Sequence, residues 1–193
     1  MVARLLIADD ESLIRMHLRE TLFALGYVIV GEAADGQQAV AMARQTRPDL
    51  VLLDYKMPHL DGLEAATILC HEGIAPVILL TASTSRELAE RARMAGVFGY
   101  LTKPFRDAEL MPLIEVTLAR WQVYQARRSE VIALRDRLET RKEIEQAKGV
   151  LMDLHGLSEA EAFRRIQQLA MRNRKTMREV AQAILLTRQL AGG

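Results

Sequence analysis

Residues 50–54, Leu-Val-Leu-Leu-Asp, form an apolar run that ends on a carboxylate. A short apolar run of this kind is typical of a strand that is buried on both faces of a sheet. Three further runs occupy residues 4–8, 77–80 and 98–101, and a less regular one occupies residues 27–33. We therefore expect a sheet of five strands with its centre shielded from water.

Helical patterns fill the gaps between these strands, at residues 11–25, 35–45, 61–70 and 85–94. Asp35-Gly-Gln-Gln38 and Asp61-Gly-Leu-Glu64 resemble capping boxes, in which a side chain satisfies free N–H groups of the first helical turn. Strands that alternate with helices of this length indicate a parallel sheet covered on both faces. The predicted fold class is a doubly wound α/β domain, (βα)5, with strand order 2-1-3-4-5 over residues 1–120.

Polar residues come at or just after the ends of four of the apolar runs: Asp9 and Asp10, Asp54, Thr81, and Lys103. Because the carboxyl ends of parallel strands open onto one edge of the sheet, these side chains should meet there. Mg²⁺ prefers oxygen ligands and is usually held by one or two carboxylates together with water. We expect Asp10 and Asp54 to bind Mg²⁺ directly, Asp9 to act through water, and a backbone carbonyl just after Asp54 to complete the set.

The same residues suit a phosphoryl group. Clustered carboxylates repel one another, and both Mg²⁺ and Lys103 would offset that repulsion. Asp54 can then act as a nucleophile and form an aspartyl phosphate. Lys103 would stabilise charge on the transferring oxygens, and Thr81 would hydrogen-bond to one of them. We expect no enzyme beyond phosphoryl acceptance and slow self-hydrolysis on Asp54.

Composition narrows the cellular setting. Half of the 193 residues are hydrophobic and 26% are charged, which is usual for a globular protein. The single cysteine, Cys70, excludes an intramolecular disulfide and fits a reducing compartment. No apolar stretch approaches the ~20 residues that a membrane span needs. We expect a cytoplasmic protein that does not associate with membranes.

Charge divides the chain into two parts. Residues 1–120 carry 12 basic and 16 acidic side chains, whereas residues 121–193 carry 14 basic and 9 acidic ones. Between Arg164 and Arg178 there are six basic residues and no acidic one. An acidic part joined to a basic part predicts that the second part binds a polyanion.

A long stretch without Gly or Pro, from Leu113 to Lys148, joins the two parts. Apolar residues recur along it at roughly helical spacing, namely Leu113, Val116, Trp121, Tyr124, Val131, Leu134 and Leu138. The helix either lies on its own domain or forms a connector, over residues 121–140, with a short coiled-coil seam. Both readings stay open because Arg127, Arg141 and Glu145 fall at seam positions.

Three short amphipathic helices are predicted within residues 141–190. Gly156 should end the first, while Ser158-Glu-Ala-Glu161 and Thr176-Met-Arg-Glu179 should open the second and third as capping boxes. Three such helices can bury one small core. We expect that core to contain Ile144, Ala147, Leu151, Leu154, Phe163, Ile166, Ala170, Met177, Val180 and Ile184.

These motifs make residues 1–120 resemble the receiver domain of bacterial two-component response regulators. The resemblance rests on Asp9-Asp10, Leu-Leu-Asp54-Tyr-Lys-Met-Pro, Thr81-Ala and Lys103-Pro104. It implies that a histidine kinase phosphorylates Asp54. It also implies that Mg²⁺ is bound by Asp9, Asp10, Asp54 and the backbone carbonyl of Lys56.

The same resemblance implies a switch. Thr81 would be the switch hydroxyl, Lys103 would bind the phosphoryl group, and Tyr100 would swing inward when Thr81 moves. The Lys103–Pro104 peptide bond would be cis, which is rare for X–Pro bonds in general, at about 5%.

The second part is similar to the ANTAR output domain. The motifs that carry this similarity are Glu145-Gln-Ala-Lys-Gly-Val-Leu-Met152, His155-Gly-Leu-Ser158, Glu161-Ala-Phe163 and Met177-Arg-Glu-Val-Ala-Gln182. Domains of this family bind RNA, recognise paired hairpins with small loops and act in transcription antitermination. The family motif includes Lys148, although Gly149 beside it can equally serve close helix packing.

The residues of this part are compatible with RNA binding. On the second helix, Arg165, Gln168 and Arg172 share one face, and Arg174, Lys175 and Arg178 continue it into the third helix. Cations on such a face neutralise phosphates, and Arg and Gln can read the exposed bases of a loop. Because Phe163 is expected in the core, we do not expect a base-stacking platform.

The sequence thus predicts a regulator in which phosphorylation of Asp54 either favours a homodimer or frees the C-terminal part, which then engages RNA hairpins. Two alternatives stay open for the output part. It could be a DNA-binding helix-turn-helix, which a palindromic DNA target would reveal, or a helical bundle for protein interaction or dimerisation.

Overall fold

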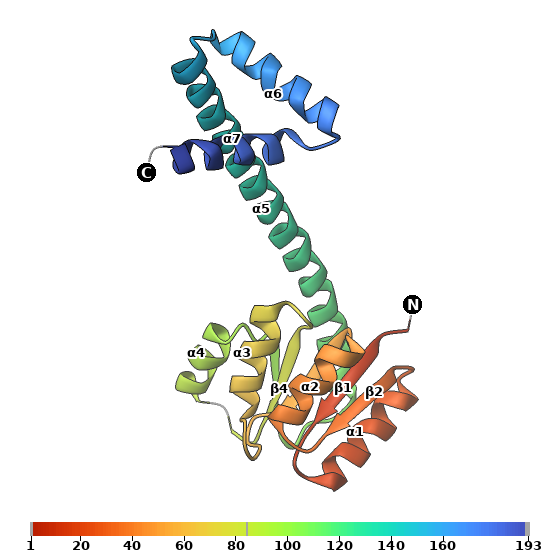
Figure 1. The fold of residues 1–193 in the computed structure, drawn as a ribbon. Helices are drawn as coiled ribbons and strands as arrows, with labels where there is room; N and C mark the ends of the chain where they lie inside the picture. Colours follow the sequence, from red (N-terminus) through yellow and green to blue (C-terminus); the bar gives the residue numbers. More distant parts are fainter. Residues whose placement is uncertain (1, 84, 192–193) are drawn as a thin grey trace. The chain divides into compact units, whose positions relative to one another are not determined.

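A five-stranded parallel sheet forms the N-terminal part of the protein, as seen in the computed structural model, which describes residues 2–83 and 85–191 (Figure 1). The strands are β1 (Arg4–Ala8), β2 (Val28–Ala33), β3 (Leu50–Asp54), β4 (Val77–Thr81) and β5 (Gly99–Thr102). Their order is β2-β1-β3-β4-β5, so the predicted doubly wound topology is confirmed.

Four helices alternate with these strands: α1 (Ser12–Ala24), α2 (Gly36–Thr46), α3 (Gly62–Glu72) and α4 (Arg86–Met94). The side chains of β1 and β3 alternate between two separate cores. Leu5 and Leu52 face a core shared with α1 and the start of the next helix, α5 (Asp107–His155), whereas Leu6 and Leu53 face a core shared with α2, α3 and α4. Every residue of β3 and β4 is buried, which explains why their sequences are apolar throughout.

The predicted capping boxes differ in how far they form. At the start of α3, Asp61 accepts the backbone N–H of Glu64 and the Glu64 side chain accepts that of Asp61, so the box is complete. At the start of α2, Asp35 accepts the N–H of Gln38 at 2.8 Å. The Gln38 side chain turns instead to the N–H of Ala34, so this box is not reciprocal.

Helix α5 spans 49 residues and contains Pro112. The chain divides along it into two compact units, Met1–Ala126 and Arg127–Gly193, which we describe separately. Within the first unit, Trp121 and Tyr124 of α5 both make edge-to-face contacts with Phe98. Gln125 donates a hydrogen bond to the carbonyl of Gly73, so α5 stays attached to the first unit as far as this residue.

The second unit packs the C-terminal part of α5 against α6 (Glu159–Asn173) and α7 (Met177–Ala191). Both predicted capping boxes are present, at Ser158 with Glu161 and at Thr176 with Glu179. Gly156 follows α5 with a φ of +64°, as expected of a helix end. The buried core comprises Ala147, Leu151, Ala162, Ile166, Ala170, Val180 and Ala181, with Ile144, Met177 and Ile184 packed at its border.

The prediction was wrong for two residues that were expected in this core. Leu154 is 64% exposed, because it lies on the last turn of α5 and the chain turns away at Gly156 before any described residue covers it. Phe163 is 42% exposed. The buried stripe of α6 runs through Ala162 and Ile166, and Phe163 lies about 100° around the helix from Ala162, on the flank of that stripe.

Of the helices in the described part of the chain, none is both long and apolar enough to cross a membrane.

Candidate functional site

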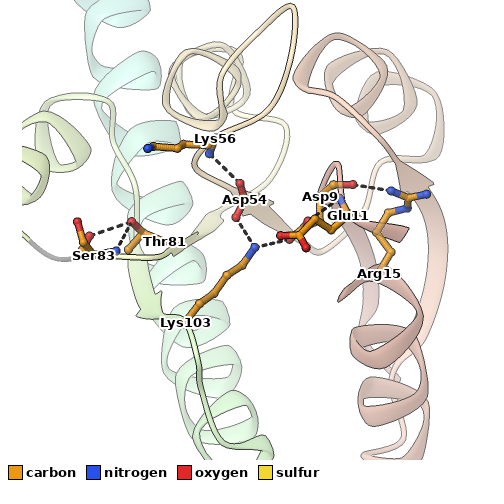
Figure 2. Close-up of polar contacts among 8 residues, drawn as sticks. All are labelled: Asp9, Glu11, Arg15, Asp54, Lys56, Thr81, Ser83 and Lys103. Carbon is orange, nitrogen blue, oxygen red and sulfur yellow. Dashed lines mark hydrogen bonds and ion pairs between the residues drawn. The ribbon is translucent and has the colours of Figure 1, made fainter. Parts of the chain in front are cut away.

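Three charged side chains meet at the carboxyl edge of the sheet, where β1, β3 and β5 end (Figure 2). The ammonium nitrogen of Lys103 lies 2.6 Å from Oδ2 of Asp9 and 2.5 Å from Oδ1 of Asp54. All three side chains are largely shielded, with 0% of Asp9, 9% of Asp54 and 17% of Lys103 exposed. One cation therefore compensates two carboxylates in a site that little water reaches.

The loop after β3 fixes the position of Asp54. The backbone N–H of Lys56 donates to Oδ2 of Asp54 at 2.7 Å. The loop then folds back so closely that a Cβ at Gly62 would lie 2.0 Å from the carbonyl oxygen of Asp54. Only glycine fits there, and its own N–H donates to the carbonyl of Tyr55.

The start of α1 holds the two neighbouring aspartates differently. Asp9 is buried and accepts the N–H of Glu11 through Oδ1, whereas the Asp10 side chain is exposed and bonds to no other described residue. Arg15 donates from Nη1 to the backbone carbonyls of both aspartates, at 2.7 and 3.2 Å. Arg15 was not among the predicted site residues, although its place one turn into the helix that follows the two aspartates was a usable signal.

Burial and pairing oppose each other at the centre of the site. Burial raises the pKa of Asp54, and the hydrogen bond and charge of Lys103 only partly offset this effect. Burial alone would lower the pKa of Lys103, but its hydrogen bonds to Asp54 and Asp9 outweigh burial and raise it. The ammonium form of Lys103 is thus strongly favoured beside a carboxylate that is costly to ionise.

The donor set also bears on metal binding. In the described part of the chain, no group of three or more His, Cys, Asp or Glu side chains is arranged to hold a metal ion. Mg²⁺ needs fewer protein ligands, because one or two carboxylates with water are sufficient. Asp9 and Asp54 both face one positive charge, the ammonium group of Lys103. Their carboxylate oxygens are hard donors of the type that a divalent cation prefers.

The remaining residues predicted for this site lie outside the charged cluster. The buried hydroxyl of Thr81 donates to the carbonyl of Ser83 at 2.9 Å, rather than toward Asp54 (Figure 2). Tyr100 is 49% exposed and borders a hollow that Leu79 and Leu88 also line. The Lys103–Pro104 peptide is cis, as the resemblance implied.

In the second unit, acidic side chains already pair with several of the cations predicted to bind RNA. Lys148 is only 6% exposed, and its ammonium contacts Glu145 at 2.8 Å and Glu159 at 2.7 Å. Arg178 contacts Glu143 and Asp136, and Lys175 contacts Glu179 at 2.8 Å. The Lys148–Glu159 pair joins α5 to α6 and the Arg178 pairs join α7 to α5, whereas Lys175–Glu179 is a local pair at the start of α7.

The other predicted residues are free of such pairs. Arg165, Arg172 and Arg174 form no ion pair with another described residue. Arg165 and Gln168 line an open groove of about 750 Å³, together with Arg164 and His155 at the end of α5. This groove is thus an open surface at two of the predicted positions.

Comparison with known proteins decides the family. The model of the response regulator receiver domain matches residues 5–115, and that of the ANTAR domain matches residues 133–185. The chain belongs to the response regulators that carry a receiver domain and an ANTAR domain.

Related proteins agree with this assignment. The chain is 50% identical over 184 residues to the transcriptional regulatory protein PdtaR of Mycobacterium tuberculosis, covering 95% of this chain and 90% of that protein. It is 33% identical over 119 residues to the chemotaxis protein CheY of Bacillus subtilis, covering 61% of this chain and 99% of that protein. Among solved structures, the receiver domain of a modulated diguanylate cyclase from Desulfovibrio desulfuricans matches with a TM-score of 0.60 and 34% identity, covering 64% of this chain and 99% of that one.

Gly149 of the ANTAR domain differs from two tightly packed glycines of the receiver domain. Outside its own helix backbone and its chain neighbours, no described atom lies within 4 Å of a Cβ built at Gly149, whereas a Cβ at Gly36 or Gly62 would lie 2.3 or 2.0 Å from a carbonyl oxygen. Close helix packing within the described chain therefore does not account for this glycine.

Proposed function

We propose that a histidine kinase phosphorylates this response regulator on Asp54, and that the phosphorylated receiver domain controls RNA binding by the ANTAR domain in transcription antitermination. The observation that carries the proposal is the contact of Lys103 with both Asp9 and Asp54 at the carboxyl edge of the sheet. It supplies a nucleophilic carboxylate, a cation for the phosphoryl oxygens and an acidic neighbour in one place.

The chemistry follows from these atoms. An oxygen of Asp54 forms a bond to phosphorus as the bond between phosphorus and the kinase histidine nitrogen breaks. Lys103 then pairs with the phosphoryl oxygens instead of the free carboxylate. Asp9, Asp10, Asp54 and the carbonyl of Lys56 would hold Mg²⁺, which supplies positive charge against the phosphoryl oxygens. The protein acts only as an acceptor that slowly hydrolyses its own phosphate, and not as an enzyme on other substrates.

The switch starts from the hydroxyl of Thr81. In the present structure this hydroxyl is bonded to Ser83 and Tyr100 is half exposed, which is the arrangement expected before phosphorylation. A phosphoryl group on Asp54 offers Thr81 a stronger, charged acceptor. Tyr100 then turns into the space beside Leu88 and alters the surface formed by α4 and β5.

RNA is the output that the ANTAR match supports over a DNA-binding helix-turn-helix or a protein-interaction bundle. Arg165, Gln168, Arg172 and Arg174 provide the RNA contacts, because their charged and amide groups form no ion pair or hydrogen bond with another described residue. Lys148, Lys175 and Arg178 serve the fold of the domain through their ion pairs.

Dimerisation is the second element of the proposed switch. Val131, Leu134 and Leu138 are exposed along α5 at coiled-coil spacing, by 47, 50 and 67%. A homodimer of the phosphorylated protein would present two ANTAR domains to two RNA hairpins, with an avidity that neither domain has alone. Such a regulator acts in the cytoplasm.

Phosphoryl acceptance is tested with acetyl phosphate and Mg²⁺, followed by the mass of the intact protein. We expect the protein to gain one phosphoryl group and the D54N variant to gain none. A phosphoryl group on D54N would overturn the assignment of the acceptor.

RNA binding is tested with a two-hairpin RNA and with duplex DNA of matched length, across a salt series. We expect the protein to bind RNA selectively. In R165E/R172E, the slope of the logarithm of the binding constant against the logarithm of the salt concentration should become shallower by about one unit for each lost phosphate contact. R19E/R44E makes the same change of charge on α1 and α2 of the receiver domain, away from the surface formed by α4 and β5, and serves as the control. Equal binding of DNA, or equal loss in both variants, would contradict the proposal.

A further inference from the structure

A hollow in the ANTAR domain, distinct from the basic groove, combines an aromatic ring with two arginines. It has a volume of about 310 Å³ and lies between α5 and α6. The half-exposed ring of Phe163 and the side chain of Ile144 supply its apolar lining, and Arg137 and Arg141 lie beside them. The open face of this phenyl ring is apolar surface that contact with a flat partner would remove from water.

Two cations of this hollow have no acidic partner. Its two acidic members pair with cations outside it, Asp136 with Arg178 and Glu145 with Lys148, and each of these cations is shared with a second carboxylate. Arg137 and Arg141 form no ion pair with another described residue. Two free guanidinium groups beside an aromatic face suit a ligand that is planar and attached to a negative charge.

We propose that this hollow binds one unpaired base of the RNA, stacked on Phe163, with its phosphate held by Arg137 and Arg141. The inference rests on the proposed function, which supplies the RNA, and adds a site that the basic face does not contain. Unpaired loop bases can leave the helical stack and lie on aromatic rings or guanidinium planes. Such stacking tolerates any base, so the site contributes affinity more than sequence preference.

The hollow is separate from the groove around Arg165. The two share no lining residue, and Arg165 lies about 200° around α6 from Phe163. The RNA would therefore contact the ANTAR domain at two places, with phosphates at one and a stacked base and its phosphate at the other. Substitutions at the two places report on different contacts.

A second copy of the chain fits this hollow less well than a base does. The seam of α5 that passes through Val131, Leu134 and Leu138 continues to Arg141 and Glu145. In a parallel two-stranded coiled coil, equivalent positions face each other. Arg141 would then meet Arg141 and Glu145 would meet Glu145, and both contacts are repulsive, so the seam of the proposed dimer ends at Leu138 and leaves the hollow open.

The test combines protein variants with abasic RNA in a double-mutant cycle. F163A removes the ring, F163Y keeps it, and R137Q/R141Q removes the two charges. Each variant is titrated with the two-hairpin RNA and with a series in which one loop nucleotide after another lacks its base. Circular dichroism and thermal unfolding establish that each variant is folded.

We expect F163A to weaken RNA binding about tenfold or more, F163Y to bind like the parent protein, and R137Q/R141Q to lower the salt dependence. At one loop position the abasic RNA should lose affinity for the parent protein but lose nothing further with F163A. Unchanged binding by F163A, or equal additive losses at every loop position, would overturn the stacking site and leave the proposed function intact.

Two other results are distinguishable from these. If F163A changes the dimerisation constant in sedimentation equilibrium while RNA affinity per dimer is unchanged, the hollow is a contact between copies of the chain and the base site is wrong. If the folded, phosphorylated parent protein binds no RNA, the proposed function fails and this site fails with it.

Discussion

Removal of the Lys103 charge is the most direct perturbation of the receiver site. The K103M variant keeps a side chain of similar length but leaves Asp9 and Asp54, which are 0 and 9% exposed, without the cation that they share. Breaking a buried ion pair by removing one partner typically costs about 3–5 kcal/mol. The structure places this site near the upper part of that range, because one cation compensates two carboxylates.

Protonation limits the loss. The variant can relieve the excess charge if Asp54 takes up a proton, and for an ordinary aspartate this costs about 4 kcal/mol at pH 7 and about 1.5 kcal/mol at pH 5. Burial already raises the pKa of Asp54, which makes proton uptake easier still. We therefore expect K103M to lose about 3 kcal/mol of unfolding free energy at pH 7 and at most about 1.5 kcal/mol at pH 5.

Urea unfolding followed by tryptophan fluorescence measures this loss. Trp121 is the single tryptophan, and it packs on Phe98 and Tyr124 in the receiver unit, so its signal reports the unfolding of that unit. K56M is the matched control, because Lys56 contacts Asp54 through its backbone N–H, which the substitution keeps, and its side chain is exposed. D54N in the K103M background should recover most of the loss. A loss below about 1 kcal/mol at pH 7, or one that does not change between pH 7 and pH 5, would refute the reasoning.

Three further predictions concern stability. Burial raises the pKa of Asp54 above its ordinary value of 3.8, so the folded protein loses stability as the pH rises and Asp54 ionises. The D54N variant avoids this loss and should be more stable than the parent protein at pH 7. The difference should vanish in unfolding curves recorded near pH 3. G62A should lose about 2–3 kcal/mol in urea unfolding, since its Cβ would collide with the carbonyl of Asp54, whereas G149A should gain about 1 kcal/mol as an open helical position; equal effects would contradict this. Lys175 and Thr176 lower the pKa of Glu179 from 4.5 to about 2, so the ANTAR domain should lose stability as the pH falls from 4.5 toward 2, and thermal unfolding of E179Q should show a weaker dependence in this range.

Sequence reasoning succeeded where the pattern of residues has one physical solution. Apolar runs such as residues 50–54 must be buried on both faces, which requires a parallel sheet covered by helices. Once that topology is accepted, Asp54 and Lys103 must meet at the carboxyl edge, and they do. The chemistry of the receiver site was therefore predictable from local runs and one topological rule.

Prediction from the sequence failed where a side chain has several neighbours with which it could pack or pair. Phe163 has the spacing of a core residue, but the contact of α6 with α5 leaves it on the flank of the buried stripe. Arg178 pairs with Asp136 and Glu143, which lie 42 and 35 residues away, and no local pattern predicts that choice. Lys148 was more accessible to prediction, because Glu145 lies one helical turn before it.

The affinity for the two-hairpin RNA, with and without beryllofluoride and Mg²⁺, tests the central claim most directly. Beryllofluoride attaches to the acceptor carboxylate as a stable substitute for the phosphoryl group. The parent protein should bind RNA more tightly when it is present, and D54N should bind equally in both conditions. Parent binding that does not respond to beryllofluoride, or a response that D54N retains, would show that Asp54 does not control the ANTAR domain.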